Sequence, residues 1–147
     1  YRTSSIDGID GGVTLDDTVA LARELKAIGV DVIDCSAGGL VGARFDLKPG
    51  YMVPFAARVR AEAGIATQAV GLVLDAQQAE AIIAQGDADL VALGREALLD
   101  PHWAARAAVE LEGEAGWKRW PPQYGWWLER RAQLLNDLET KGSGSIK

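Results

Sequence analysis

The stretch "ADLVALGREALLDPHW", which runs from Ala88 to Trp103, decides the fold. Its first apolar residues predict a short buried strand over 89–94. The strand ends at Gly94 and Arg95, and a short helix signal, "EALL", follows at once. A strand that passes through a turn directly into a helix is typical of a βα unit, in which the strand lies in a parallel sheet.

The same order of elements, a helix, a glycine, a short apolar strand and a loop, occurs three times, with the glycines at Gly29, Gly64 and Gly86. This alternation predicts βαβ units and a parallel sheet. Two architectures fit, a doubly wound sheet and a (β/α)8 barrel, and three units are too few to close a barrel. We expect one helix after the N-cap Thr14, with Asp17 at the third helical position, and a second helix from Pro54. A third is expected after the N-cap Asp75, with Gln78 in the capping-box position, and a fourth after Asp100-Pro101, to about Glu112. The expected strands are 30–35, 65–71 and 89–94.

The composition is that of an ordinary globular domain, with 147 residues, 48% apolar and 24% charged. The net charge is -6 with both signs interspersed, which disfavours nucleic acid as a partner, because phosphate binding needs a basic face. No apolar run approaches the roughly 20 residues of a membrane span, so no membrane partner is expected. Cys35 and His102 are the only cysteine and the only histidine. This chain alone therefore predicts no disulfide and no metal site, and a reducing, cytoplasmic setting is the simplest interpretation.

The C-terminal segment has a different character. Four tryptophans fall close together among prolines and a tyrosine, without periodicity, which suits a satellite core, a subunit interface or a ligand wall. A charged helical tail is expected over 132–141. Residues 142–147, "GSGSIK", suggest an engineered flexible linker and the start of a fused segment. The four tryptophans are Trp117, Trp120, Trp126 and Trp127.

Two consecutive strands end in residues suited to phosphate. One ends on Gly71 and the next on Gly94 and Arg95. Ligands bind at the C-terminal ends of strands in parallel α/β folds, glycine lets the backbone approach an anion, and arginine adds a bidentate cation. The alternative is that both glycines are turn residues and Arg95 is a solvated surface charge. The spacing by itself leaves both interpretations open.

Four other residues carry weaker signals. Cys35 ends an apolar strand and is expected to pack in the core, since no general base is in sight. His102 is expected at the surface. Asp34 lies within a strand, where the sequence assigns it no partner. Arg2, in "YRTSSID", fits either a ligand contact or a surface position.

Several motifs, in this order and spacing, resemble the C-terminal part of the old yellow enzyme flavoproteins: "RTSSID", "GVDVIDCSAGG", "QAVGLV" and "DLVALGREALLDPHWAARAA". The segment "PPQYGWWLERR" resembles the C-terminal segment of the thermophilic-like and xenobiotic-reductase branch. The resemblance covers residues 1–131. It implies that they are the C-terminal part of a (β/α)8 barrel, from about the end of strand 5 through strand 8 and the C-terminal segment.

The resemblance also implies a cofactor and a reaction. FMN is held noncovalently, is reduced by NADPH or NADH, and passes hydride to an alkene conjugated to a carbonyl or nitro group. Arg2 would face the N1/C2=O edge of the flavin, where a cation stabilises the anionic reduced form. The other implied contacts are Ala69, Val70 and Gly71 beside the flavin and its phosphate, Gly94 and Arg95 as a phosphate clamp, and Trp127, with Trp126 beside it, as a wall of a neighbouring subunit's substrate pocket.

The catalytic groups of that family have no counterpart in this chain. They are a pair of His, or a His and an Asn, that bind the substrate oxygen, a Tyr that donates a proton, and a Cys that tunes the flavin. We therefore assign no catalytic residue here and expect a complementary N-terminal fragment as partner, with a homo-oligomer formed through the Trp-rich segment. Two other functions stay open, a barrel fragment that binds a sugar phosphate and a non-catalytic half-barrel that only assembles.

Overall fold

The computed structural model describes residues 1–142. The chain divides into two compact units, Tyr1–Leu99 and Asp100–Lys147, and the second is described to Gly142. The first unit is α/β, and the described part of the second is helical. The linker expected over 142–147 lies outside the described residues apart from Gly142, which ends the last helix. The domain boundaries expected from the sequence therefore stay predictions.

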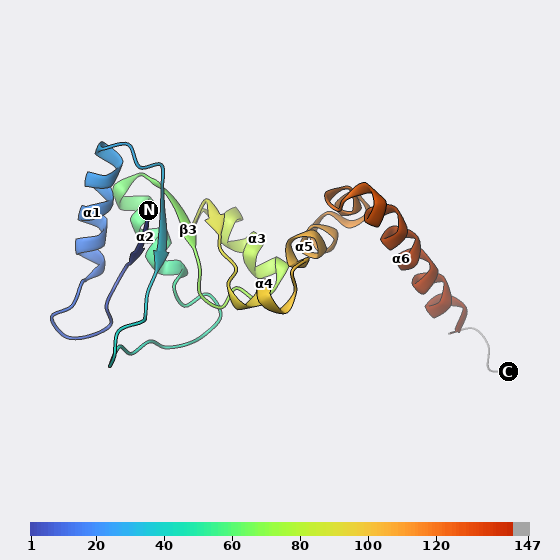
Figure 1. The fold of residues 1–147 in the computed structure, drawn as a ribbon, viewed down its shortest axis with the longest axis horizontal. Coiled ribbons are helices and arrows are strands. Elements are labelled where there is room, and N and C mark those ends of the chain that lie inside the picture. The colour runs from blue at the N-terminus through green and yellow to red at the C-terminus, as the bar shows by residue number, and fades with distance from the viewer. Residues whose placement is uncertain (143–147) are drawn as a thin grey trace. The chain divides into compact units, whose positions relative to one another are not determined.

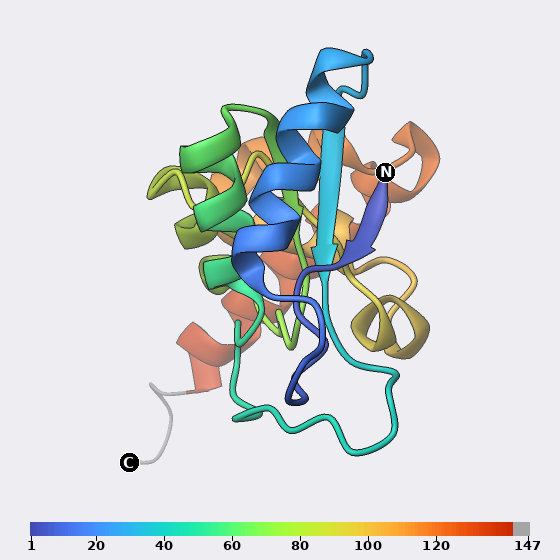
Figure 2. The same cartoon turned by 90° about the vertical axis from the view of Figure 1, so that its left-hand side faces the viewer.

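Parallel strands form the sheet of the first unit. Their order is β1-β2-β3-β4, so that consecutive strands are neighbours throughout. A doubly wound sheet instead reverses its strand order at a switch point, whereas a (β/α)8 barrel keeps sequential order. Figure 2 shows β1 and β2 side by side and pointing the same way. The strands are β1 (Arg2–Ser4), β2 (Val32–Ser36), β3 (Ala66–Ala69) and β4 (Leu90–Val91).

Two helices of the first unit begin after the caps expected at Thr14 and Asp75, whereas the helix expected from Pro54 begins one residue earlier, at Val53. Thr14 and Asp17 form a complete capping box, and the Asp75 carboxylate accepts the N–H of Gln78 at 2.7 Å. The Gln78 side chain does not close a second capping box, because its Oε1 accepts instead from the N–H of Leu74 at 2.9 Å. The helices, shown in Figure 1, are α1 (Leu15–Ala27), α2 (Val53–Ala63), α3 (Ala76–Ala84) and α4 (Arg95–Leu99).

The ends of the elements follow the glycines. A glycine with positive φ lies at the end of each of the first three helices. Gly64 directly follows α2, whereas Gly29 and Gly86 follow α1 and α3 after one intervening residue. The strands differ from the expected ranges: the one expected over 30–35 is Val32–Ser36, and the next two are shorter than expected. The strand expected over 65–71 is reduced to Ala66–Ala69 and the one over 89–94 to Leu90–Val91. Residues 70–71 and 92–94 follow these strands at the C-terminal edge of the sheet, and Ile65 and Asp89 precede them at the opposite edge.

The two faces of the sheet differ. Ile33 and Cys35 of β2 and Thr67 and Ala69 of β3 are buried, and the apolar ones belong to a core with side chains of α1, α2 and α3. This is the alternation expected of strands with one face against helices. The opposite face carries a row of register neighbours that stays partly exposed, namely Arg2, Asp34, Gln68 and Leu90.

The second unit consists of α5 (Trp103–Glu112), a 3₁₀ helix η1 (Gly113–Arg119) and α6 (Pro122–Gly142). The expectation that Asp100-Pro101 starts the long helix is wrong, because His102 is the N-cap and α5 begins at Trp103. The Asp100 carboxylate accepts the N–H of His102 at 3.0 Å and pairs with Arg106, so Asp100 caps a preceding turn.

The tryptophan segment is helical, contrary to its irregular sequence pattern. The ring of Trp120 lies 5.2 Å from that of His102, and its Nε1 donates to the carbonyl of Ala105 at 3.1 Å. Gly116 permits close packing, since a Cβ there would lie 2.4 Å from the carbonyl oxygen of Ala108. The tail expected over 132–141 is part of α6. Within the described residues, no helix is both long and apolar enough to cross a lipid bilayer.

Candidate functional site

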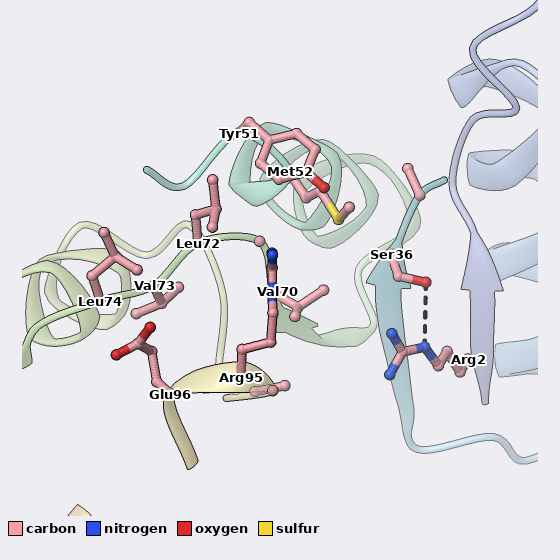
Figure 3. Close-up of a pocket in the computed structure, with 14 residues that line it drawn as sticks. Arg2, Ser36, Tyr51, Met52, Val70, Leu72, Val73, Leu74, Arg95 and Glu96 are labelled. Carbon is pink, nitrogen blue, oxygen red and sulfur yellow. Dashed lines mark hydrogen bonds between the residues drawn. The ribbon is translucent and has the colours of Figure 1, made fainter. Parts of the chain in front are cut away.

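A hollow of about 150 Å³ lies at the C-terminal ends of the strands, and we call it the strand-end hollow. Five of the six cofactor contacts implied by the sequence line it. Ala69 does not, because its side chain points into the helix-covered core and is fully buried. In Figure 3 residues 72–74 lie on one side, Arg2 and Ser36 on the other, and Val70 and Arg95 between them. The lining thus includes Arg2 of β1, Ser36 of β2, Val70 and Gly71 after β3, and Gly94 and Arg95 around the start of α4.

The turn after β3 is tightly built. Gly71 has φ +112°, and a Cβ there would lie 3.0 Å from the Cβ of Met52. Leu72, with φ +53°, is the one non-glycine residue between 1 and 142 with positive φ. The N–H of Gly50 is shared between the carbonyls of Gly71 (2.9 Å) and Leu72 (3.2 Å). Gly71 is therefore required by the protein's own packing.

The Gln78 side chain holds the same turn from the outside. Its Nε2 donates to the carbonyl of Leu72 at 3.1 Å, and its Oε1 accepts from the N–H of Leu74 at 2.9 Å. No acceptor within residues 1–142 takes the N–H of Gly71. Gly71 thus lines the strand-end hollow with a backbone N–H that has no acceptor among the described residues.

The turn after β4 is open by comparison. A Cβ on Gly94 would meet nothing within 4 Å, and the φ of Gly94 is not in the left-handed region. The Gly94 N–H also has no acceptor in the described part of the chain. The Arg95 side chain is exposed and extends into the hollow (Figure 3), and among residues 1–142 it forms no ion pair or hydrogen bond. Nothing in the chain's own packing requires a glycine and an arginine here.

Arg2 is held in place by two neighbours on β2. Its Nη1 lies 3.2 Å from Oδ2 of Asp34, and its Nε donates to Oγ of Ser36 at 3.3 Å, drawn as the dashed line in Figure 3. The other oxygen of Asp34, Oδ1, is buried without a partner in the described residues. The sequence left Asp34 without a partner. The signal that could have found one is the strand register, which pairs Arg2 with Asp34.

The remaining candidates lie elsewhere. Cys35 is fully buried, and burial raises the pKa of its thiol to about 11, so the thiol is protonated at neutral pH and packs as core, as expected. Trp126 and Trp127 belong to the second unit, where both are exposed and their ring centroids lie 4.5 Å apart. Arg130 stacks over the ring of Trp126 at 4.3 Å. The described residues contain no cluster of His, Cys, Asp and Glu that could hold a metal ion.

Comparison with known proteins shows which family the chain belongs to. The model of the NADH:flavin oxidoreductase / NADH oxidase family matches residues 1–114. The chain belongs to this family. This confirms the resemblance to the old yellow enzyme flavoproteins, and membership in the NADH:flavin oxidoreductase / NADH oxidase family implies FMN as cofactor.

Bacterial relatives of the family are similar to this chain. An NADPH dehydrogenase of Geobacillus thermodenitrificans is 46% identical over 125 residues, which cover 80% of this chain and 37% of that protein. An NADPH dehydrogenase of Bacillus subtilis is 45% identical over 113 residues, covering 77% of this chain and 33% of that protein. The chain thus spans about a third of the length of the curated relatives it matches.

The residues around the strand-end hollow fit the phosphate end of FMN. Gly94 has open space where a Cβ would lie, and within the described residues two backbone N–H groups lack acceptors and Arg95 has no ion-pair partner. The volume of the strand-end hollow is below the roughly 300–1,000 Å³ of a complete small-molecule pocket.

Proposed function

We propose that this chain is the C-terminal part of an FMN-dependent ene-reductase, which reduces activated C=C bonds of enones, enals, maleimides or nitroalkenes with hydride from NADPH or NADH. The observation that carries the proposal is the open turn at Gly94-Arg95, which the protein's own packing does not explain. The cytoplasm is the compartment we propose for it.

Gly94 and Arg95 hold the phosphate in this proposal. The Gly94 N–H approaches a phosphate oxygen because no Cβ is in the way, and the Arg95 guanidinium forms charge-assisted hydrogen bonds to it. Gly71 adds a second backbone donor from the neighbouring strand end. Both turns lie at the carboxyl ends of adjacent parallel strands, the usual place for ligands in such sheets.

Arg2 binds the flavin ring in the same proposal. FMN supplies the hydride-transfer chemistry when it is bound. The guanidinium of Arg2 provides the positive charge that stabilises the anionic reduced ring at its N1 edge. Asp34 and Ser36 fix its orientation through the 3.2 Å ion pair and the 3.3 Å hydrogen bond.

The rest of the active site comes from outside the chain. A complementary N-terminal half supplies the groups that bind the substrate oxygen, and it completes a (β/α)8 barrel in which this chain forms the end of strand 5 through strand 8. The sequential parallel sheet and the partly exposed row Arg2, Asp34, Gln68 and Leu90 support such a completion. The exposed pair Trp126 and Trp127 contributes to a substrate pocket of a neighbouring subunit in a homo-oligomer.

The test compares Arg95→Ala with Arg131→Ala in the protein combined with its N-terminal half. Arg131 is also exposed, and no ion pair of Arg131 is found in the described residues, so it is a matched control. Loss of a charged hydrogen-bond partner of the phosphate costs about 1.5–3 kcal/mol, which weakens FMN binding by roughly 10- to 160-fold. The Arg131→Ala protein keeps its affinity, measured by quenching of flavin fluorescence.

A complex that stays colourless and takes up no FMN would overturn the proposal. If it binds a sugar phosphate instead, the alternative of a phosphate-binding barrel of another class holds. Oxidation of NADPH in the presence of cyclohexenone separates an enzyme from a half-barrel that only assembles, since assembly alone predicts no turnover.

A further inference from the structure

We propose that Gln78 is a positioning residue for the cofactor site. Its side-chain amide holds residues 72–74, directly after β3, in the conformation that leaves the N–H of Gly71 available at the strand-end hollow. This inference rests on the proposed function, because it assigns that N–H to the phosphate of FMN.

The contacts of Gln78 span the turn. The amide nitrogen donates to the carbonyl of Leu72 at 3.1 Å and the amide oxygen accepts from the N–H of Leu74 at 2.9 Å. One planar side chain thus bonds both ends of a three-residue segment, which fixes the distance between them. Gln78 is itself anchored, because its backbone N–H donates to the N-cap Asp75 at 2.7 Å.

The segment that Gln78 holds, residues 72–74, contains a backbone conformation that is unfavourable without external contacts. Leu72 has φ +53°, a left-handed conformation that a leucine rarely adopts and that persists only where the surroundings impose it. The Leu72 carbonyl accepts from the Gln78 amide and also from the N–H of Gly50, at 3.2 Å. Without these donors Leu72 is expected to relax toward negative φ, which reorients the Gly71–Leu72 peptide and, through the backbone torsions of Gly71, displaces the N–H of Gly71.

Gly50 makes room for the side chain of Gln78. A Cβ on Gly50 would lie 3.3 Å from the Nε2 of Gln78, so the amide occupies space that a side chain would fill. On the other side of the turn, Gly71 packs against Met52. The turn is therefore contacted both by Gly50 and Met52, just before α2, and by Gln78 in the first turn of α3.

Gln78 acts through the backbone and not by touching the ligand. It lines a groove between α2 and α3, together with Arg58 and Asp87, and does not line the strand-end hollow. The charged groups that line the strand-end hollow are Arg2, Arg95 and Glu96. The amide is neutral at every pH, so the clamp does not depend on the charge of these neighbours.

The experiment compares Gln78→Met with Gln77→Met in the protein combined with its N-terminal half. Methionine keeps the length of the side chain and removes both hydrogen bonds without changing the charge. Gln77 precedes it on α3, is exposed, and makes no side-chain hydrogen bond within the described residues. Affinity is measured for FMN and for riboflavin, which lacks the phosphate.

We expect Gln78→Met to weaken FMN binding about tenfold, because only a fraction of molecules keeps the competent turn, and to weaken riboflavin binding less than about twofold. Gln77→Met should change neither affinity. A role limited to general stability would lower both affinities together. An unchanged ratio of FMN to riboflavin affinity in Gln78→Met would therefore overturn the inference.

Amide hydrogen exchange of the cofactor-free protein supplies a readout that needs no flavin. Gln78→Met should accelerate exchange over residues 70–74, above all at the N–H of Leu74, while Gln77→Met should not. Unchanged exchange there would contradict the clamp even if FMN bound normally. If the parent protein binds no FMN, the proposed function fails, and the exchange data still decide whether Gln78 holds the turn.

Discussion

The turns after β3 and β4 line the same hollow, and they are built in opposite ways. After β3, Gly71 packs against Met52 and Leu72 is held by Gln78 and Gly50. After β4, Gly94 has open space around it, and no partner of Arg95 lies within residues 1–142. A glycine can therefore mark either the chain's own packing or space kept for something else. Substitution of a glycine of the first kind should lower the free energy of unfolding, whereas substitution of one of the second kind should lower ligand affinity.

The largest expected effect is on folding, at the turn after β3. Gly71→Ala forces an L side chain into φ +112° and places a Cβ 3.0 Å from Met52, so we expect the free energy of unfolding to fall by about 2–4 kcal/mol. Urea denaturation followed by circular dichroism measures it. A loss below about 0.5 kcal/mol would mean that the turn is not held as described.

The matching change at the turn after β4 should reverse the outcome. Gly94→Ala meets open space and ordinary φ, so the free energy of unfolding should stay within about 0.5 kcal/mol of the parent value. The new methyl group keeps the phosphate from the Gly94 N–H, and this costs about 1–2 kcal/mol, or roughly tenfold in FMN affinity. Flavin fluorescence titration measures that loss. Full FMN affinity in this variant would remove the distinction between the two turns.

The smallest effect concerns the opposite ends of the same two strands, which are tied together. Asp89, just before β4, pairs with Arg60 and accepts the N–H of Thr67 of β3 at 2.9 Å. The hydrogen bond from Arg60, followed by that from Thr67, lowers the pKa of the Asp89 carboxyl below its ordinary value of 3.8. A carboxyl with a lowered pKa in the folded state stabilises the fold above its ordinary pKa and loses this contribution as pH falls through the lowered value.

Asp89→Asn should therefore be less stable than the parent protein above about pH 5, and the gap should narrow below about pH 4. Urea midpoints between pH 7 and pH 3 measure the gap. Asp31→Asn is the control, because Asp31 is exposed and no ion pair or side-chain hydrogen bond of it is found in the described residues. A gap that does not change with pH would show that the Asp89 carboxylate contributes no charge-dependent stability.

Local sequence signals predicted the elements of the first unit well. The caps at Thr14 and Asp75 depend only on residues three positions apart, so a linear pattern contains them. The ends of β3 and β4 were predicted too far along the chain and the end of β2 one residue too early, because pairing depends on a neighbouring strand that is distant in the sequence. The start of α5 was misplaced because Asp100 has two possible uses, a helix N-cap or the cap of a turn.

The sequence by itself determined the alternation of helices and parallel strands, the glycines that end the helices, and the placement of Gly71, Gly94 and Arg95 at adjacent strand ends. These features follow from local spacing and backbone preference. Only the tertiary structure decided that Asp34 and Ser36 orient Arg2, and that Met52, Gly50 and Gln78 account for the turn at Gly71. Those contacts join residues from different elements, and their geometry exists only once the sheet register and helix packing are set.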